Sequence, residues 1–276
     1  LIIDEEQNFG VKQKEKLKTY KKSLHVLSLS ATPIPRSLQM SLSSIRSLSI
    51  IATPPIDRLV TRNFIMEYDS ITIKEAIRRE FTRGGKIFFV CPHIKDIEEL
   101  QPKLEKLVPE IKIKSAHGQM TPDALDKIMN DFYDNKFHLL LSTNLIGSGI
   151  DIPSANTIFI YKADFFGLAQ LYQLRGRVGR SKTRAFAYFI TKKNKKLTSN
   201  ATRRLSVMQA IDSLGAGFNI ATSDMDIRGC CNIIGGEQSG HIKEVGVELY
   251  QELLKDEIEK QQNQNNQNFT TNYEVN

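Results

Sequence analysis

Cysteine is scarce and long apolar runs are absent in this sequence, and each absence excludes a class of protein. Three of the 276 residues are cysteines, Cys91, Cys230 and Cys231, and they form no Cys-x-x-Cys pair. A disulfide scaffold is therefore excluded, and a reducing compartment is expected. No apolar run approaches the roughly 18 residues that a membrane-spanning helix needs, so the sequence does not predict a transmembrane protein.

A strong charge of one sign and metal-ligand spacing are also lacking. The chain has 38 Lys and Arg against 31 Asp and Glu, a formal net charge of +7, which permits a polyanionic partner without requiring one. The five histidines have no ligand spacing, so we expect no histidine metal site. The chain starts at Leu1 without a charged-then-apolar leader, so we expect neither a signal peptide nor a natural start.

A glycine loop that cradles phosphates is missing as well. The pattern Gly-x-x-x-x-Gly-Lys-Ser/Thr does not occur. The only Gly-Lys pair, Gly85-Lys86, is followed by Ile87 and has Glu80 where the first glycine is required. We therefore expect this chain alone to hold a triphosphate poorly.

The sequence does contain short apolar runs that alternate with amphipathic stretches, which is typical of βαβ units and a parallel sheet. We expect strands at 26–29, 86–90, 111–114, 138–141, 157–160 and 185–190, and helices at 73–81, 96–107, 122–133, 168–174 and 205–214. Thr121 and Pro122 fit the N-cap and first turn of a helix. About five strands after a boundary near residues 53–60 form a doubly wound domain.

The character of the chain changes after Thr191. Glycines crowd the stretch from Gly215 to Gly240, which we expect to be rich in loops. The final segment, 261–276, is rich in Gln and Asn and has no Lys or Arg, so we expect it to be disordered.

The sharpest chemical signal is the segment Gln173-Leu174-Arg175-Gly176-Arg177-Val178-Gly179-Arg180. Its three arginines are spaced so that at least two can point the same way from a helix end. Arginine offers a planar, always charged fork that matches phosphate oxygens. Such side chains stabilise the charge that develops on a transferred phosphoryl group.

Three further segments place carboxylates or hydroxyls at the ends of expected strands. Leu1-Ile2-Ile3 runs into Asp4-Glu5-Glu6-Gln7, and acidic residues at the carboxyl end of a strand can hold a Mg²⁺–phosphate complex. Ser30-Ala31-Thr32 follows the strand at 26–29, and Ser142-Thr143 precedes Gly149-Ile150-Asp151. The hydroxyls suit phosphates, and Asp151 suits a ribose hydroxyl.

Taken together and in this order, these segments resemble motifs II, III, V and VI of superfamily-two helicases and translocases. The runs that narrow the resemblance to the transcription-repair coupling factor family are 29–36, 50–55, 117–120, 163–171, 226–229 and 237–240. The resemblance covers residues 1 to about 255. It is stronger than the resemblance to branch-migration helicases of the RecG type.

The resemblance implies an α/β RecA-like P-loop NTPase fold in which ATP binds between two lobes. Residues 1–58 would be the C-terminal part of the first lobe, and 59–195 the complete second lobe. Residues 196–258 would form a helical hairpin and loop used in translocation, and 259–276 the disordered tail.

The resemblance also implies roles for individual residues. Asp4 would support Mg²⁺ through water, and Glu5 would orient or deprotonate the attacking water. Arg177 and Arg180 would act as arginine fingers. The residues that would contact nucleotide or DNA, or couple nucleotide state to DNA movement, are Ser30, Thr32, Thr143, Gly149, Asp151, Gln173, Arg228 and Gln238.

The sequence departs from the family pattern at Gly147, Cys231 and Gly236, which stand where Glu, Gly and Glu are usual, and Gln7 stands where His is frequent. One hypothesis for the first three is relaxed selection on a degenerate or split gene. Because the phosphate cradle is missing, we expect no meaningful ATP hydrolysis from this chain by itself.

The family resemblance implies ATP and Mg²⁺ as cofactors and double-stranded DNA as a partner in a bacterial cytoplasm. RNA polymerase and an excision-repair damage-recognition protein would bind through domains outside this chain. Two alternatives remain open. One is a RecG-like motor on branched DNA, and the other is a non-catalytic RecA-like lobe that binds DNA or complements a separate polypeptide.

Overall fold

The computed structural model of the chain describes residues 1–5, 9–10, 12–13, 16–17, 24–31, 49, 51, 59–143, 152–211 and 217–228. The chain divides into two compact units, Leu1–Ile51 with Gly217–Asn276, and Ala52–Ala216. Each unit has its own sheet of parallel strands. The domain bounds expected at 58/59 and 195/196 stay predictions.

The second unit is built on six parallel strands. These are β3 (Arg62–Glu67), β4 (Lys86–Val90), β5 (Ile113–Ala116), β6 (Leu139–Ser142), β7 (Ala155–Tyr161) and β8 (Phe186–Thr191). Their order across the sheet is β3-β8-β7-β4-β6-β5. Every residue of β4 is buried, as expected for a central strand covered on both faces.

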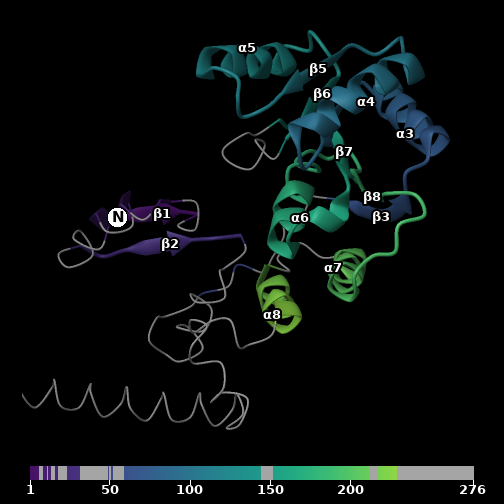
Figure 1. The fold of residues 1–276 in the computed structure, drawn as a ribbon. Helices are drawn as coiled ribbons and strands as arrows, with labels where there is room; N and C mark the ends of the chain where they lie inside the picture. Colours follow the sequence, from purple (N-terminus) through teal and green to yellow (C-terminus); the bar gives the residue numbers. More distant parts are fainter. Residues whose placement is uncertain are drawn as a thin grey trace, which may run out of the picture. The chain divides into compact units, whose positions relative to one another are not determined.

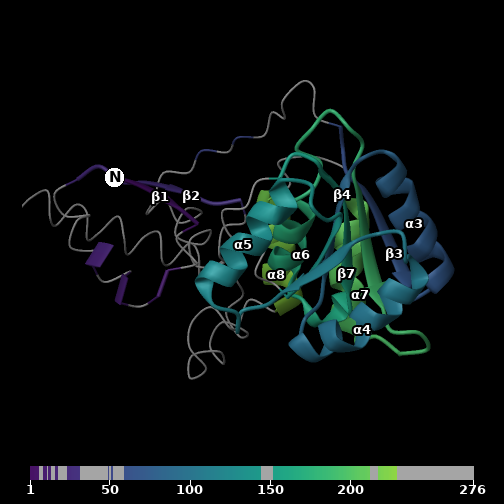
Figure 2. The same cartoon turned by 90° about the horizontal axis from the view of Figure 1, so that it is seen from above.

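Helices cover both faces of this sheet (Figures 1 and 2). They are α3 (Ser70–Thr82), α4 (Ile94–Leu107), α5 (Pro122–Tyr133), α6 (Leu168–Arg175) and α7 (Ser199–Ala210), with a short 3₁₀ turn, η3 (Ala163–Phe165). Figure 2 shows α3 and α4 on one face and α5 and α6 on the other. The side chain of Thr121 accepts a hydrogen bond from the N–H of Ala124, so the predicted N-cap of α5 is confirmed.

Aromatic rings stack on the face of the sheet that α3 and α4 cover, and all of them are buried in the core except Phe64, which is 40% exposed. Phe89, Phe159, Tyr188 and Phe64 stack one after another across β4, β7, β8 and β3, with ring centroids 5.3, 4.8 and 5.1 Å apart. Such pairs stabilise neighbouring strands beyond the area they bury. The stack fixes the register of the four strands beside α3.

The first unit contains two short parallel strands, β1 (Ile2–Asp4) and β2 (Leu27–Leu29), in which Asp4 lies opposite Leu29. It also contains helix α8 (Gly217–Arg228). The expected loop-rich character of the stretch from Gly215 was therefore wrong for residues 217–228, which are helical. Of the range 196–258, where the helical hairpin and loop were expected, residues 229–258 lie outside the described residues, as does the tail at 259–276.

The predicted α/β parallel architecture is confirmed. In the second unit, β3 was not expected, β5 spans 113–116 where the pattern predicted 111–114, and α7 begins at Ser199 and ends at Ala210 where it predicted 205–214. None of the helices in the described ranges has the length and apolar character that a membrane span requires.

Candidate functional site

The acidic residues Asp4 and Glu5 lie at the carboxyl end of β1. Ile3 is buried and anchors the strand, whereas Asp4 is exposed. Glu5 has a φ of 49°, in the left-handed region, and its N–H donates to the carbonyl of Leu29 at 2.9 Å. The chain therefore turns sharply at Glu5 while it stays bound to β2.

The side chain of Glu5 connects this acidic end to the loop after β2. Its Oε1 accepts a hydrogen bond from the N–H of Ala31 at 3.2 Å. Ser30, which is exposed, lies immediately before Ala31. The structure therefore brings Asp4, Glu5 and Ser30 together, while Thr32 lies outside the described residues.

The exposed carboxylate of Asp4 suits the magnesium role expected for it. Magnesium usually keeps several waters and takes one or two protein carboxylates together with substrate phosphates. Among the described residues, no group of three or more His, Cys, Asp or Glu side chains could hold a metal by itself. These residues fit a metal that is held jointly with a nucleotide.

The segment from Gln173 to Arg180, called the arginine segment below, begins in the last turn of α6 in the second unit. Leu171, Leu174 and Val178 are buried and anchor it, while Gln173 and Arg177 are half-buried. Arg180 is exposed, and its Nε donates to the carbonyl of Gly176 at 3.3 Å. An exposed guanidinium is a group that can pair with a phosphate.

Arg175 behaves differently from the other two arginines, because it is only 4% exposed. Its Nε donates to Oδ1 of Asn63 at 3.2 Å, and its Nη2 donates to the carbonyls of Ile211, at 3.2 Å, and Thr61. Asn63 in turn donates to the carbonyl of Met208 at 2.8 Å, which is at the end of α7. Arg175 therefore binds α6 to the start of β3 and to the end of α7.

Sequence reasoning missed this structural role, although a signal for it was available. Leu168, Leu171 and Arg175 recur at helical spacing, and the first two positions are apolar. The same face of the helix therefore carries Arg175 inward.

Gly179 allows the arginine segment to approach the sheet closely. Its φ is +76°, and a Cβ added there would lie 2.8 Å from Oγ1 of Thr61 and 3.0 Å from Cβ of Ala185. Both the conformation and the space therefore require glycine.

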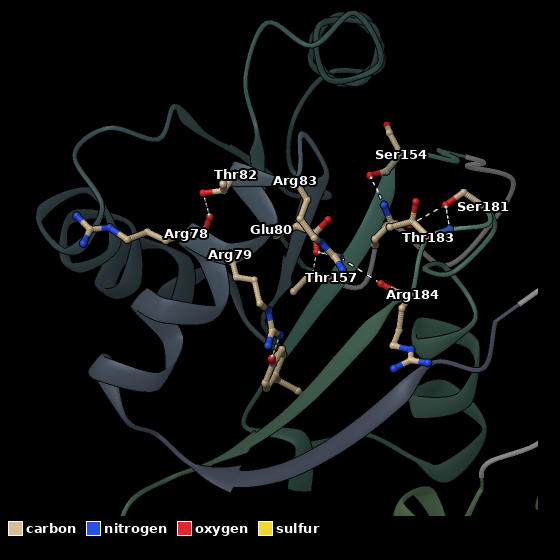
Figure 3. Close-up of polar contacts among 12 residues, drawn as sticks. Arg78, Arg79, Glu80, Thr82, Arg83, Ser154, Thr157, Ser181, Thr183 and Arg184 are labelled. Carbon is tan, nitrogen blue, oxygen red and sulfur yellow. Dashed lines mark hydrogen bonds and ion pairs between the residues drawn. The ribbon is translucent and has the colours of Figure 1, made fainter.

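The end of the arginine segment lies at the end of the sheet where strands β7 and β8 begin (Figure 3). Ser181 Oγ donates to Oδ1 of Asn156 at 3.0 Å, and Asn156 Nδ2 donates to the carbonyl of Ser154. The carbonyl of Ile152 accepts from the N–H of Ala155 at 3.0 Å, so Ile152 lies at this end as well. The chain immediately after Asp151 is thus at the same end of the sheet as the segment after Arg180.

Thr143 lies at the opposite end of the sheet, after the carboxyl end of β6. Its N–H donates to the carbonyl of Ala116 at the end of β5, at 3.3 Å. Thr143 and Ile152 flank the stretch whose hydroxyls and carboxylate sequence reasoning placed near one edge, and these two residues lie at opposite ends of the parallel strands. Gly147, Gly149 and Asp151 themselves lie outside the described residues.

The expected coupling residues near the C-terminus are described only in part. Arg228 is the last residue of α8, and its side chain lies outside what the structure describes. Cys231, Gly236 and Gln238 lie outside the described residues.

Comparison with known proteins agrees with this architecture. Residues 70–182 match the family described as the helicase conserved C-terminal domain. The structure of RecG bound to a three-way DNA junction superposes with a TM-score of 0.66 and 31% identity, over 92% of this chain and 33% of that one. S. cerevisiae Dbp5 bound to RNA and ADP BeF3 shares the fold, with a TM-score of 0.52 and 16% identity, over 88% of this chain and 62% of that one. The second unit is thus a RecA-like helicase lobe.

The sequence matches are more specific. The chain is 57% identical to the transcription-repair-coupling factor of Rickettsia prowazekii (strain Madrid E) and 48% identical to that of Escherichia coli (strain K12), in each case over 94% of this chain and 23% of the relative. The chain is therefore homologous to a segment of the transcription-repair-coupling factors. It spans about a quarter of the length of these two relatives.

Proposed function

We propose that this chain is the motor portion of an ATP-dependent double-stranded DNA translocase that couples transcription to excision repair by displacing stalled RNA polymerase. The observation that carries the proposal is its identity of 47–57% to transcription-repair-coupling factors over 94% of its length. The 31% identity to RecG is lower.

The described side chains support separate roles for the acidic residues and the arginines in ATP hydrolysis. Bound Mg²⁺–ATP supplies the phosphoryl group that is transferred. Asp4, exposed at the end of β1, would hold the magnesium through water, and Glu5 would orient the attacking water and accept its proton. Arg177 and Arg180 neutralise the charge on the phosphates, as arginine fingers do.

The remaining residues couple this chemistry to DNA. Ser30 and Thr32 link the state of the nucleotide to closure of the two lobes, and the hydrogen bond from Ala31 to Glu5 supports this role for the loop after β2. Thr143 contacts the DNA backbone from the carboxyl edge of β6, while Gly149, Asp151 and Gln173 contact nucleotide. Arg228 and Gln238 transmit closure of the lobes to DNA movement.

The partners follow from the same proposal. Double-stranded DNA binds the motor itself, in the bacterial cytoplasm. RNA polymerase and the excision-repair damage-recognition protein bind domains outside this chain. Because the sequence contains no phosphate cradle, a first lobe that carries one completes the ATP site.

A hybrid protein tests this function: this chain replaces the matching 258-residue segment of the R. prowazekii relative. We expect the hybrid to displace a third strand from duplex DNA and to remove stalled RNA polymerase when ATP is present. Unwinding of three-way junctions without polymerase removal would favour a RecG-like motor. Salt-dependent DNA binding by the hybrid without ATP hydrolysis would favour the non-catalytic lobe.

A further inference from the structure

The segment that carries Arg177 and Arg180 is held at its far end by Arg83. This residue caps α3, and its Nη2 donates to the carbonyl of Arg184 at 3.2 Å (Figure 3). Its guanidinium also lies over the ring of Phe186, 5.2 Å from the centroid. Arg83 thus fixes the chain just before β8 begins.

Arg83 is itself held by Glu80, which is fully buried. The Glu80 carboxylate forms an ion pair with Arg83 and accepts a hydrogen bond from Oγ1 of Thr157, on β7, at 2.6 Å. A buried carboxylate is tolerated when it is paired and hydrogen-bonded in this way. The pair therefore has one well-defined position relative to the sheet.

The turn after α3 leaves the carboxylate little room to move. A Cβ added at Gly85 would lie 1.7 Å from Oε1 of Glu80. This oxygen is buried and has no hydrogen-bond partner among the described residues. Close packing on one side and bonds on the other hold Glu80 in place.

We propose that Glu80 and Arg83 are positioning residues for the arginine fingers. Contacts run from Thr157 through Glu80 and Arg83 to the carbonyl of Arg184, four residues after Arg180. The bond between Ser181 and Asn156 holds the middle of the same stretch. The arginines therefore stand on a loop that is fixed to β7 and to α3. The catalytic consequence rests on the proposed function; the positioning itself does not.

Hydrogen–deuterium exchange on the full chain tests the positioning directly. In Arg83→Ala and Arg83→Lys, we expect the amides of residues 177–184 to exchange about tenfold faster, with β7 unchanged. Arg83→Lys keeps a positive charge beside Glu80, so it guards against simple misfolding. The matched control is Arg78→Ala. Arg78 is on α3 as well, and its exposed ion pair with Glu110, with Nε and Oε1 2.5 Å apart, does not reach the loop. Unchanged exchange at 177–184 in both Arg83 variants overturns the proposal.

ATP hydrolysis by the hybrid protein tests the catalytic consequence. We expect Glu80→Gln and Arg83→Lys to lower kcat by roughly 10- to 100-fold while KM for ATP changes little, because misplaced groups cost transition-state stabilisation more than binding. Arg78→Ala should match the unaltered hybrid. Faster amide exchange at residues 177–184 together with a normal kcat would overturn the proposal that Glu80 and Arg83 position the arginine fingers. A hybrid without any hydrolysis would instead contradict the proposed function, while the exchange result still decides the structural part.

Discussion

The carboxylate of Glu5 accepts a hydrogen bond from the N–H of Ala31 at 3.2 Å, and this contact joins the acidic end of β1 to the loop after β2. The N–H of Glu5 donates to the carbonyl of Leu29, the last residue of β2. Any movement of Glu5 therefore reaches Ser30 and its neighbours directly. Under the proposed function, the residue that would orient the attacking water is thus also bonded to the loop after β2.

Substitution of Glu5 separates these two roles in the hybrid protein. Glu5→Gln keeps an oxygen that can accept from Ala31 but removes the base, so we expect ATP turnover on duplex DNA to fall about 100- to 10,000-fold. Nucleotide-dependent DNA binding should persist in Glu5→Gln and be lost in Glu5→Ala. Normal turnover by Glu5→Gln would contradict the assigned role.

The buried and exposed arginines of one segment should respond differently to truncation. In the full chain, Arg175→Ala removes a donor to the buried carbonyl of Thr61 and one of the two donors to the carbonyl of Ile211, and should lower the free energy of unfolding by about 2–4 kcal/mol. Arg180→Ala should change it by less than about 0.5 kcal/mol, because the side chain is exposed. Urea denaturation measures both. Equal effects would show that Arg175 does not anchor α6.

Two glycines with positive φ allow backbone strain to be separated from steric clash. Gly179→Ala combines a φ of +76° with contacts as short as 2.8 Å, and should destabilise the chain by about 2–3 kcal/mol. Gly84→Ala is the control: its φ is +72°, but a Cβ there meets no described atom within 4 Å, so we expect about 1 kcal/mol. A Gly84 variant that unfolds as easily as the Gly179 variant would argue against the close approach.

Asp131 should make stability depend on pH in the acid range. Hydrogen bonds from Lys114, at 2.8 Å, and Lys136, at 2.7 Å, lower the pKa of this carboxyl from 3.8 to about 2. Because the pKa of Asp131 is lower in the folded state than in the unfolded state, its ion pairs stabilise the fold above about pH 4. This stabilisation is lost as the pH falls towards 2. Unfolding of Asp131→Asn should lack this dependence, whereas the neighbouring Asp134→Asn should retain it. Identical pH profiles for Asp131→Asn and the unaltered chain would refute the ion-pair assignment.

Much of the fold could be predicted from the sequence because its central elements have clear patterns. Strand β4 and helix α5 have the bounds that apolar runs and the Thr121-Pro122 start indicated. Strand β3 was missed because it is an edge strand with alternating exposure and no continuous apolar run. The residue pattern did not indicate helix α8 because Gly217, Asn219 and Thr222 have weak helix propensity, whereas the family resemblance implied a helical hairpin within 196–258.

The sequence predicted the residue types of the candidate site, but not the residues elsewhere in the chain that hold them in place. Charge and spacing singled out Arg177 and Arg180, yet their loop is contacted by Arg83, which Glu80 holds in place at the end of α3, about a hundred residues earlier in the chain. No local pattern records such a contact. The opposite placement of Thr143 and Ile152 likewise follows from the route of the chain between β6 and β7, which spacing alone does not fix.

The most direct test of the account is ATP turnover on double-stranded DNA, measured side by side for this chain alone and for the hybrid protein. We predict no measurable turnover by the chain alone, because it contains no phosphate cradle. The hybrid should turn over ATP in a DNA-stimulated manner that Arg180→Ala reduces by about a thousandfold. Turnover by the chain alone, or a hybrid that is indifferent to Arg180→Ala, would contradict the claim that this chain supplies the arginine-bearing lobe of a two-lobed motor.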